Sequence, residues 1–305
     1  MNILLAGASG FVGQELIRAL KPNHRVTALG RKETRLRYND SDHITYCTWD
    51  ELSHLNANDY DAVINLCGYN IAASRWTHRV KKQLIDSRVK TSETLIQWAI
   101  SHHAKPHFLC ANAVGIYGLQ DNGDPASFDE DTPIDLEHPR DFLSEIGIRW
   151  QQALKPAVDY GMPVTTLRFG VVLKKTGGML RKLMPSFYFG LGSIVGDGRQ
   201  MISWVHMDDI VGAIIFLLNK PELTGPVNIT SPNPVSQAQF ARAMAASMHR
   251  PLLFTMPAFF IRALFGKMGD CLLLKGQRVL PKRLIASGYA FHHAQLAEAL
   301  QQEFD

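Results

Sequence analysis

The sequence predicts a doubly wound α/β fold, and three observations support this. Short apolar runs alternate with helical patterns through the first half of the 305-residue chain, an order typical of parallel strands joined by helical crossovers. The first apolar run leads directly into three glycines, Gly7, Gly10 and Gly13, at the start of an amphipathic pattern. From about Gly170 glycine and proline become more frequent, which predicts a smaller, lid-like second part over the carboxyl ends of the strands.

The elements of the first half follow from the spacing of apolar residues. Val12, Leu16 and Leu20 share one face of the helix that follows the first strand. The expected strands are at 1–6, 25–29, 44–47, 61–66, 107–111 and 164–169, and the expected helices are at 10–20, 81–100 and around 140–155.

The second half mixes helices with short strands. Asp208 or Asp209 is expected to cap a helix at 210–218. A strand is expected at 227–230, helices at 236–247 and 257–265, and an amphipathic segment at 293–303. We therefore expect a dinucleotide-binding domain at 1–170, rejoined by about 203–220, and a smaller substrate domain at 171–305, with 251–305 as a C-terminal module.

Composition excludes several classes of protein. The net charge of +4 is too small to indicate a nucleic-acid partner, and no apolar run reaches the roughly 18 residues of a membrane span. The four cysteines lie far apart without a C-x-x-C pair, so neither a zinc site nor a disulfide framework is expected, and the cytoplasm is the expected compartment. The adjacent histidines at 102–103 and 292–293 point in different directions on a helix, and we expect no metal site.

The glycine loop predicts a dinucleotide cofactor. Gly7 and Gly10 suit a tight turn and a close approach of backbone amides to a pyrophosphate, and Gly13 lets the helix lie against the strand. The helix N-terminus adds unpaired N–H groups and the positive end of its dipole. The predicted cofactor-binding residues of this loop are Gly7, Ser9, Gly10, Phe11, Val12 and Gly13.

The end of the second strand favours NADP(H) over NAD(H). An acidic residue there binds ribose hydroxyls, whereas a basic one accommodates a 2′-phosphate. Here the strand ends in Arg31 and Lys32, with no carboxylate until Glu33. An arginine can pair with phosphate through two charge-assisted hydrogen bonds. The alternative is that both side chains only face water.

Several motifs beyond the loop carry a family resemblance. They are Asn65-Leu66-Cys67-Gly68, Ala113-Val114-Gly115-Ile116-Tyr117-Gly118, 192–200, Ser203-Trp204-Val205-His206, 225–228 and Arg278-Val279-Leu280-Pro281. With them the chain resembles the extended short-chain dehydrogenase/reductases, which have a Rossmann sheet, and most closely their NAD-dependent epimerase/dehydratase subgroup. Within it the chain looks most like a branch with a small C-terminal domain of undefined role, some of whose members are labelled cell-division inhibitors.

The resemblance extends the set of expected contacts. It implies that Leu66, Cys67 and Gly68 lie against the cofactor, and Arg88 is a further candidate contact, although exposure on a helix surface is the alternative. It also implies dimers formed through helices that include one near residues 81–100. Arg199, Gln200, Ser203 and Trp204 are candidate substrate contacts in a glycine-flanked segment; Arg199 could instead pair with Asp197.

The same resemblance implies a Ser/Tyr/Lys centre, which this chain lacks. Leu143 and Gly147 stand where tyrosine and lysine would fall, and none of the eight tyrosines has a lysine four positions later. Asn112 is nearest the expected serine, but an amide does not exchange protons usefully near neutral pH.

Two other residues are candidate proton donors. His206 has an ordinary pKa near 6.5 and precedes a predicted helix, and Tyr117 lies beside Gly118. Their alternatives are a structural histidine and an aromatic wall of the pocket. The sequence is therefore consistent with an NADP(H)-dependent epimerase or oxidoreductase acting on a small carbonyl or hydroxyl substrate with an atypical centre. It is also consistent with a non-catalytic NADP(H) sensor whose segment 251–305 contacts a protein partner.

Overall fold

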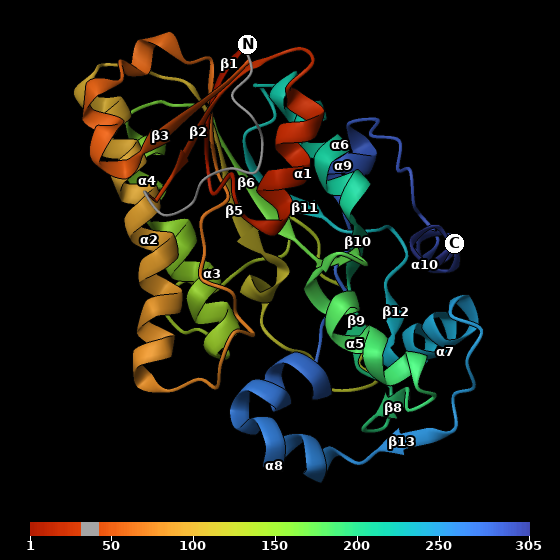
Figure 1. Ribbon diagram of the computed structural model, residues 1–305. Helices are drawn as coiled ribbons and strands as arrows, with labels where there is room; N and C mark the ends of the chain where they lie inside the picture. Colours follow the sequence, from red (N-terminus) through yellow and green to blue (C-terminus); the bar gives the residue numbers. More distant parts are fainter. Residues whose placement is uncertain (32–42) are drawn as a thin grey trace.

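A parallel sheet forms the larger part of the molecule in the computed structural model, which describes residues 1–31 and 43–305 (Figure 1). Its strand order is β11-β6-β5-β4-β1-β2-β3, and every neighbouring pair is parallel. The strands are β1 Asn2–Ala6, β2 Arg25–Gly30, β3 Ile44–Thr48, β4 Ala62–Asn65, β5 His107–Ala113, β6 Val164–Phe169 and β11 Gly225–Ile229. The predicted doubly wound α/β class is confirmed.

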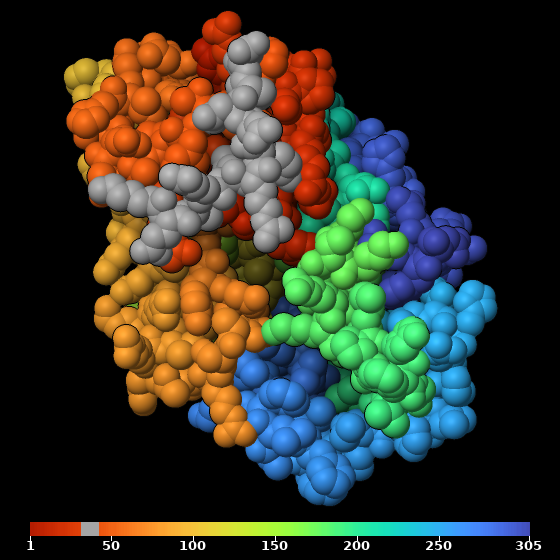
Figure 2. Space-filling view, viewed as in Figure 1, coloured from red at the N-terminus to blue at the C-terminus, as the bar shows by residue number. Residues whose placement is uncertain are grey.

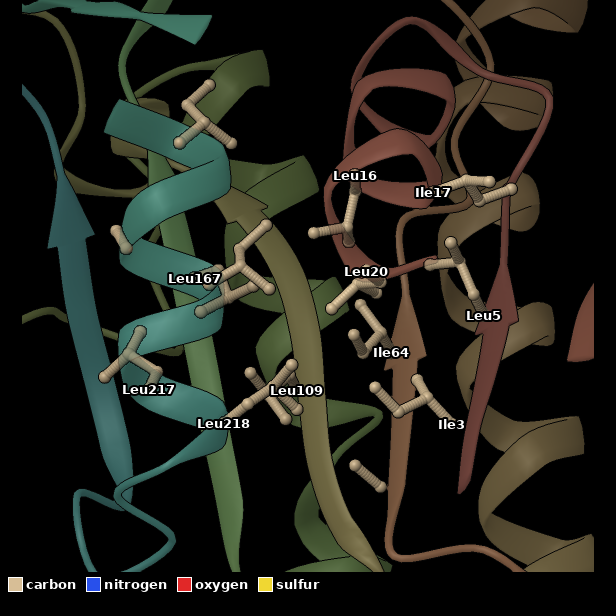
Figure 3. Packing of buried hydrophobic residues seen from close by; sticks show 14 of the residues in the cluster. Ile3, Leu5, Leu16, Ile17, Leu20, Ile64, Leu109, Leu167, Leu217 and Leu218 are labelled. Atoms are coloured by element: carbon tan, nitrogen blue, oxygen red, sulfur yellow. The ribbon is translucent and has the colours of Figure 1, made fainter. Parts of the chain in front are cut away.

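Helices cover both faces of this sheet. The first face carries α1 Phe11–Leu20 and α6 Met207–Leu218, and the second carries α2 His78–Ser101, α3 Phe142–Gln152 and α4 Lys155–Asp159. On the first face Leu16 and Leu20 of α1 lie against Ile3 and Leu5 of β1 in a fully buried cluster (Figure 3). This packing fixes where α1 starts relative to the end of β1.

The smaller part consists of short strand pairs and helices below the sheet's carboxyl edge in Figure 1. The paired strands are β7 Val171–Lys174 with β10 Trp204–His206, β8 Ser193–Val195 with β13 Phe254–Met256, and β9 Met201–Ile202 with β12 Val235–Ser236. The helices of this part are α5 Gly178–Tyr188, α7 Gln237–Ser247, α8 Ala258–Gly269 and α10 Leu296–Phe304, whereas α9 Lys282–Ala286 lies beside α6, with Leu284 buried in the cluster of the main sheet. A separate apolar cluster around Trp204 and Phe240 forms its core.

One strand lies outside the part to which the sequence pattern assigned it. The strand expected at 227–230 in the smaller domain is β11, which extends the main sheet by pairing with β6. Val227 and Ile229 are buried in the same cluster as Leu167 of β6. The larger part is thus rejoined by β11 as well as by the expected segment around α6. Within the described ranges, no helix is both long and apolar enough to cross a membrane.

Three buried carboxylates attach the C-terminal segment to the rest of the chain. Glu130 accepts hydrogen bonds from the backbone N–H of Asn228 at 2.8 Å and of Arg283 at 3.4 Å. Asp209 accepts from the backbone N–H of His292 at 2.7 Å and of His293 at 2.9 Å. The third, Glu303 on α10, accepts from the backbone N–H of Lys175 at 2.6 Å. Residues 251–305 are therefore held by buried polar contacts as well as by apolar packing.

Candidate functional site

The loop between β1 and α1 has the close backbone packing that only glycine permits. Gly7 has a φ of +83°, and a Cβ there would lie 2.8 Å from the carbonyl carbon of Leu66. A Cβ on Gly13 would lie 2.3 Å from the carbonyl oxygen of Gly7. The backbone N–H of Gly10 donates to that same oxygen at 2.9 Å. The loop is thereby held directly above the end of β1.

The first turn of α1 is suited to an anion. Its N-cap residue is Gly10, and no side chain caps the helix, so the first amides are available to a phosphate group. The carbonyl of Ser9 accepts a hydrogen bond from the Gln14 side chain at 2.9 Å, and Val12 packs partly into the core. The ring of Phe11 lies so close to Gly177 that a Cβ there would be 2.3 Å from it. Phe11 thus joins the loop to the start of α5.

The segment after β4 forms a second side of this site. The buried Asn65 accepts a hydrogen bond from the Cys67 backbone N–H at 3.0 Å and donates to Ser92 on α2 at 3.0 Å. These two bonds hold Leu66 and Cys67 against Gly7. Burial raises the pKa of the Cys67 thiol to about 12, so this group stays neutral and is not a nucleophile.

Arg88 of α2 lies beneath the same segment. A Cβ on Gly68 would lie 3.0 Å from its guanidinium carbon. The guanidinium donates to the carbonyl of Leu84 at 2.8 Å and lies over the Trp150 ring at 5.1 Å. Burial lowers the pKa of Arg88 to about 10, which leaves it charged at neutral pH. Arg88 therefore places a positive charge next to the candidate cofactor loop, rather than on an outer helix surface.

Arg31 follows β2 on the neighbouring side of the glycine loop. The pairing of Ala6 with Leu29 sets the ends of β1 and β2 side by side. The Arg31 side chain is exposed, and its carbonyl accepts a hydrogen bond from the Tyr46 hydroxyl. Lys32, the second predicted phosphate contact, lies outside the described residues.

The end of β5 differs from the sequence-based expectation. Asn112 is buried and does not offer its amide to a substrate. It donates to the carbonyl of Gly147 at 3.0 Å and accepts from the Ala113 N–H at 2.8 Å, so its role is to hold α3 against β5. The exposed residue at this strand end is Ala113, and Leu143 of α3 borders Gly115 in the next turn. The side chains at this point are thus apolar.

Tyr117 is also held in a buried network. Its hydroxyl donates to the Asn228 side chain at 2.9 Å and accepts from Arg168 at 2.7 Å. The ring stacks on Phe128, with the ring centres 5.2 Å apart. Burial raises the pKa of Tyr117 above its ordinary value near 10. The structure supports the alternative of a structural tyrosine over a proton donor.

The His206 side chain is fully buried. Its Nε2 is 2.9 Å from Glu303, and its Nδ1 accepts from the Asp208 backbone N–H at 3.3 Å as the N-cap of α6. Burial lowers the pKa of this imidazole, although Glu303 opposes the shift. An imidazole that is fully buried and hydrogen-bonded at both nitrogens does not contact a substrate in this conformation. The geometry therefore again supports a structural histidine.

The four candidate substrate residues are not gathered in a cleft. Gln200 is buried and donates to the carbonyls of Val195 and Leu273. Ser203 donates to the Gln277 carbonyl at 2.9 Å, and the Trp204 indole donates to the Asn233 carbonyl at 2.9 Å. In this structure the polar groups of these three side chains join segments of the smaller part to one another. Arg199 is exposed, and its backbone N–H, rather than its guanidinium, contacts Asp197.

The two parts of the molecule contact each other across the site. Lys182 of α5 donates to the Ala72 carbonyl at 2.8 Å, and Arg75 donates to the carbonyls of Ala263 and Leu264 on α8. Figure 2 shows a hollow between the orange segment and the green segment, which meet across it. These contacts could not be predicted from local sequence patterns, since each joins residues more than 100 positions apart.

The chain is similar to known proteins over nearly its whole length. A model of the NAD dependent epimerase/dehydratase family matches residues 3–230, and a domain of unknown function (DUF1731) matches residues 256–303. Epimerase family protein Mb2239 of Mycobacterium bovis is 37% identical over 303 residues, which cover 98% of this chain and 96% of that protein. Epimerase family protein SDR39U1 of Bos taurus is 32% identical over 306 residues, covering 99% of both chains.

Solved structures show the same fold. The crystal structure of human epimerase family protein SDR39U1 (isoform 2) with NADPH superposes with a TM-score of 0.86 at 29% identity, over 99% of this chain and 98% of that one. The UDP-glucuronic acid 4-epimerase of Bacillus cereus in complex with NAD has a TM-score of 0.75 at 18% identity, over 100% of this chain and 96% of that one. The second likeness is one of fold alone.

Proposed function

Because this chain belongs to the NAD-dependent epimerase/dehydratase family, we propose that it is an NADP(H)-dependent oxidoreductase of atypical centre that acts on a small carbonyl or hydroxyl substrate. The observation that carries the proposal is the glycine loop, which is packed against β4 and followed by a helix without a side-chain cap. Bound there, the cofactor supplies or accepts a hydride. The chain's own residues bind it and orient it.

Two arginine side chains and the uncapped N-terminus of α1 surround the loop. The first turn of α1 and Arg88 are suited to the pyrophosphate, and Arg31 is suited to a 2′-phosphate. The human relative was crystallised with NADPH, which supports this assignment of the phosphate. We expect NADPH to bind more tightly than NADH.

The Arg31→Ala variant tests the phosphate assignment. Loss of one charge-assisted phosphate pair is expected to weaken NADPH binding by about tenfold or more, the equivalent of roughly 1.5–3 kcal/mol, and to leave NADH binding nearly unchanged. Titration calorimetry with both cofactors measures this difference. Arg18→Ala, an exposed change on α1, is the matched control. Equal loss for NADH and NADPH would contradict a phosphate contact at Arg31.

The residues near the carboxyl ends of the sheet strands bear on which group protonates the substrate oxygen. Tyr117 and His206 are both buried and use their polar atoms in hydrogen bonds, while Ala113 and Leu143 offer no exchangeable proton. Water is the remaining donor to the substrate oxygen. Such a site favours acceptors that are reduced easily without a strong acid, such as quinones and activated aldehydes.

A panel of aldehydes, ketones and quinones tests the activity directly. With NADPH carrying deuterium at the transferable position of the nicotinamide, a turned-over aldehyde or ketone should gain one deuterium on its carbonyl carbon. If the protein binds NADPH but consumes none with any compound of the panel, this result would count against oxidoreductase activity. If a folded Tyr117→Phe variant no longer transfers deuterium, Tyr117 rather than water would be the proton donor.

A second candidate function is a cofactor-binding sensor that contacts a partner protein. The exposed apolar side chains of α8, Phe259, Phe260 and Leu264, favour it, as does the absence of the Tyr/Lys pair. Affinity capture with purified protein, with and without NADPH, distinguishes the two candidates. If the same proteins are captured with and without NADPH, this result would contradict the sensor function.

A further inference from the structure

Two residues at the start of α6, His206 and Asp208, lie beside His293 from the distant C-terminal segment. One ligand atom from each of His206, Asp208 and His293 lies within 4.8 Å of the other two. Asp208 Oδ2 is 3.5 Å from His206 Nδ1 and 3.5 Å from His293 Nε2. The imidazole rings of the two histidines are 4.1 Å apart between centres. They meet because the coil between α9 and α10 passes the start of α6 (Figure 1), where Asp209 accepts hydrogen bonds from the backbone N–H groups of His292 and His293.

We propose that His206, Asp208 and His293 form a zinc-binding site that joins the C-terminal segment to α6. Imidazole nitrogen and carboxylate oxygen are ligands that Zn²⁺ accepts in tetrahedral sites, with bonds of about 2.0–2.2 Å. Tetrahedral bonds of that length place neighbouring ligand atoms about 3.3–3.6 Å apart. The two 3.5 Å separations from Asp208 Oδ2 match this geometry, and the two imidazole nitrogens lie within 4.8 Å of each other.

The surroundings of His206 prepare it as a ligand. Its Nε2 faces the carboxylate of Glu303 at 2.9 Å; a carboxylate accepts, so the proton is assigned to Nε2 and the lone pair to Nδ1. Metal-bound histidines commonly donate their second N–H to a carboxylate in this way, which fixes the ring and its tautomer. The 3.3 Å hydrogen bond that Nδ1 accepts from the Asp208 N–H is long, and it is the contact that a metal would replace.

Charge and access also fit a cation. The ammonium group of Lys174 lies 3.2 Å from Glu303 Oε1 and 3.8 Å from Asp208 Oδ1, so it is not paired with Asp208 Oδ2. The carboxylates of Asp208 and Glu303 thus face one ammonium group, and a third carboxylate, Asp209, accepts from the backbone N–H of His293 at 2.9 Å. The Asp208 side chain is 42% exposed, so an ion can enter from solvent and a water can complete the coordination. The site lies outside the glycine loop and does not depend on the proposed function.

Metal titration of the full-length, untagged protein after chelator treatment tests the site. Calorimetry with Zn²⁺ alone should show one equivalent bound per chain, and Co²⁺ should give the visible absorption of a tetrahedral or five-coordinate ion. Asp208→Asn and His293→Gln should each weaken Zn²⁺ binding by more than about 100-fold, and Glu303→Gln, outside the ligand set, by about 10–100-fold. Thermal melting without metal checks that each variant is folded.

His292→Gln is the matched control, because His292 is the exposed neighbour of His293 and takes no part in the cluster. It should bind Zn²⁺ as the parent protein does. No stoichiometric binding by the parent would overturn the proposal. Equal loss of Zn²⁺ affinity in the His292 and His293 variants would also overturn the proposal, as would unchanged affinity in Asp208→Asn. Either result would show adventitious binding of Zn²⁺ to surface histidines.

Discussion

At the scale of single residues, Gly13 shows how tightly the cofactor loop is built. A Cβ there would lie 2.3 Å from the Gly7 carbonyl oxygen and 2.8 Å from that of Ala8, both backbone atoms that cannot rotate away. Gly13→Ala should therefore displace the loop. We expect a loss of about 1–3 kcal/mol in the free energy of unfolding, as for other overpacked sites, and at least tenfold weaker NADPH binding.

Chemical denaturation and cofactor titration measure the two effects of Gly13→Ala. Arg18→Ala on the same helix is the control, because its exposed ion pair with Glu15 contributes a few tenths of a kcal/mol. Unchanged NADPH affinity in Gly13→Ala would show that the loop does not position the cofactor.

Residue roles could be predicted where they depend on neighbours in the chain, and not where they depend on distant partners. The steric role of Gly7 and Gly13 follows from a turn of a few residues, and the structure confirms the close packing. The roles of Tyr117 and His206 depend on Asn228 and Glu303, which lie 111 and 97 positions away. A single sequence has no local signal for such pairs. The buried position of Asn112 could not be predicted for the same reason: its side chain donates to the backbone carbonyl of Gly147 in α3, 35 positions away.

At the scale of elements, the pairing of β5 with β6 encloses a titratable side chain. His107 is 5% exposed, its Nε2 lies 2.9 Å from the Thr165 hydroxyl, and its Nδ1 is buried without a partner. The Thr165 hydroxyl donates to the Leu223 carbonyl, so it accepts the proton of a neutral imidazole. Burial lowers the pKa of His107 to about 4, well below its value near 6.5 in an unfolded chain.

This shift predicts a pH dependence of stability. The unfolded chain takes up the His107 proton at higher pH than the folded chain, so stability is complete above pH 6.5 and is lost as the pH falls toward 4. The loss is on the order of 3 kcal/mol at its limit. His107→Gln should reduce the slope of unfolding free energy against pH in that window, measured by urea denaturation. His54→Gln, at an exposed histidine, should leave the slope unchanged; a parent-like slope in His107→Gln would contradict the assignment.

Elements were predicted best where a long periodic pattern defines them. The helix expected at 81–100 is α2, His78–Ser101, and the strand expected at 164–169 is β6. β11 was assigned to the smaller part because a pattern of five residues does not indicate which strand they pair with. Its place beside β6 depends on the crossover through α6, which is a property of the whole chain.

At the scale of the whole molecule, Asp209 joins α6 to the C-terminal segment. It is 1% exposed and accepts from the N–H groups of His292 and His293 and, at 3.1 Å, from the Tyr289 hydroxyl. Asp209→Asn replaces one acceptor oxygen with an NH₂ group, which then faces a donor. A buried donor without an acceptor costs about 1–3 kcal/mol. We expect this cost to appear first as local opening of residues 289–304, since the main sheet has its own core.

Hydrogen exchange with mass spectrometry on the metal-free protein measures this opening. Peptides from residues 289–304 should exchange about tenfold faster or more in Asp209→Asn, the factor for about 1.4 kcal/mol, while peptides from β4 and β5 keep the parent rate. Asp159→Asn, whose side chain is 59% exposed and pairs with Lys155 on α4, is the control and should change neither region. If the sheet and the C-terminal segment were instead accelerated together, the segment would be an inseparable part of one cooperative unit rather than a module held by Asp209.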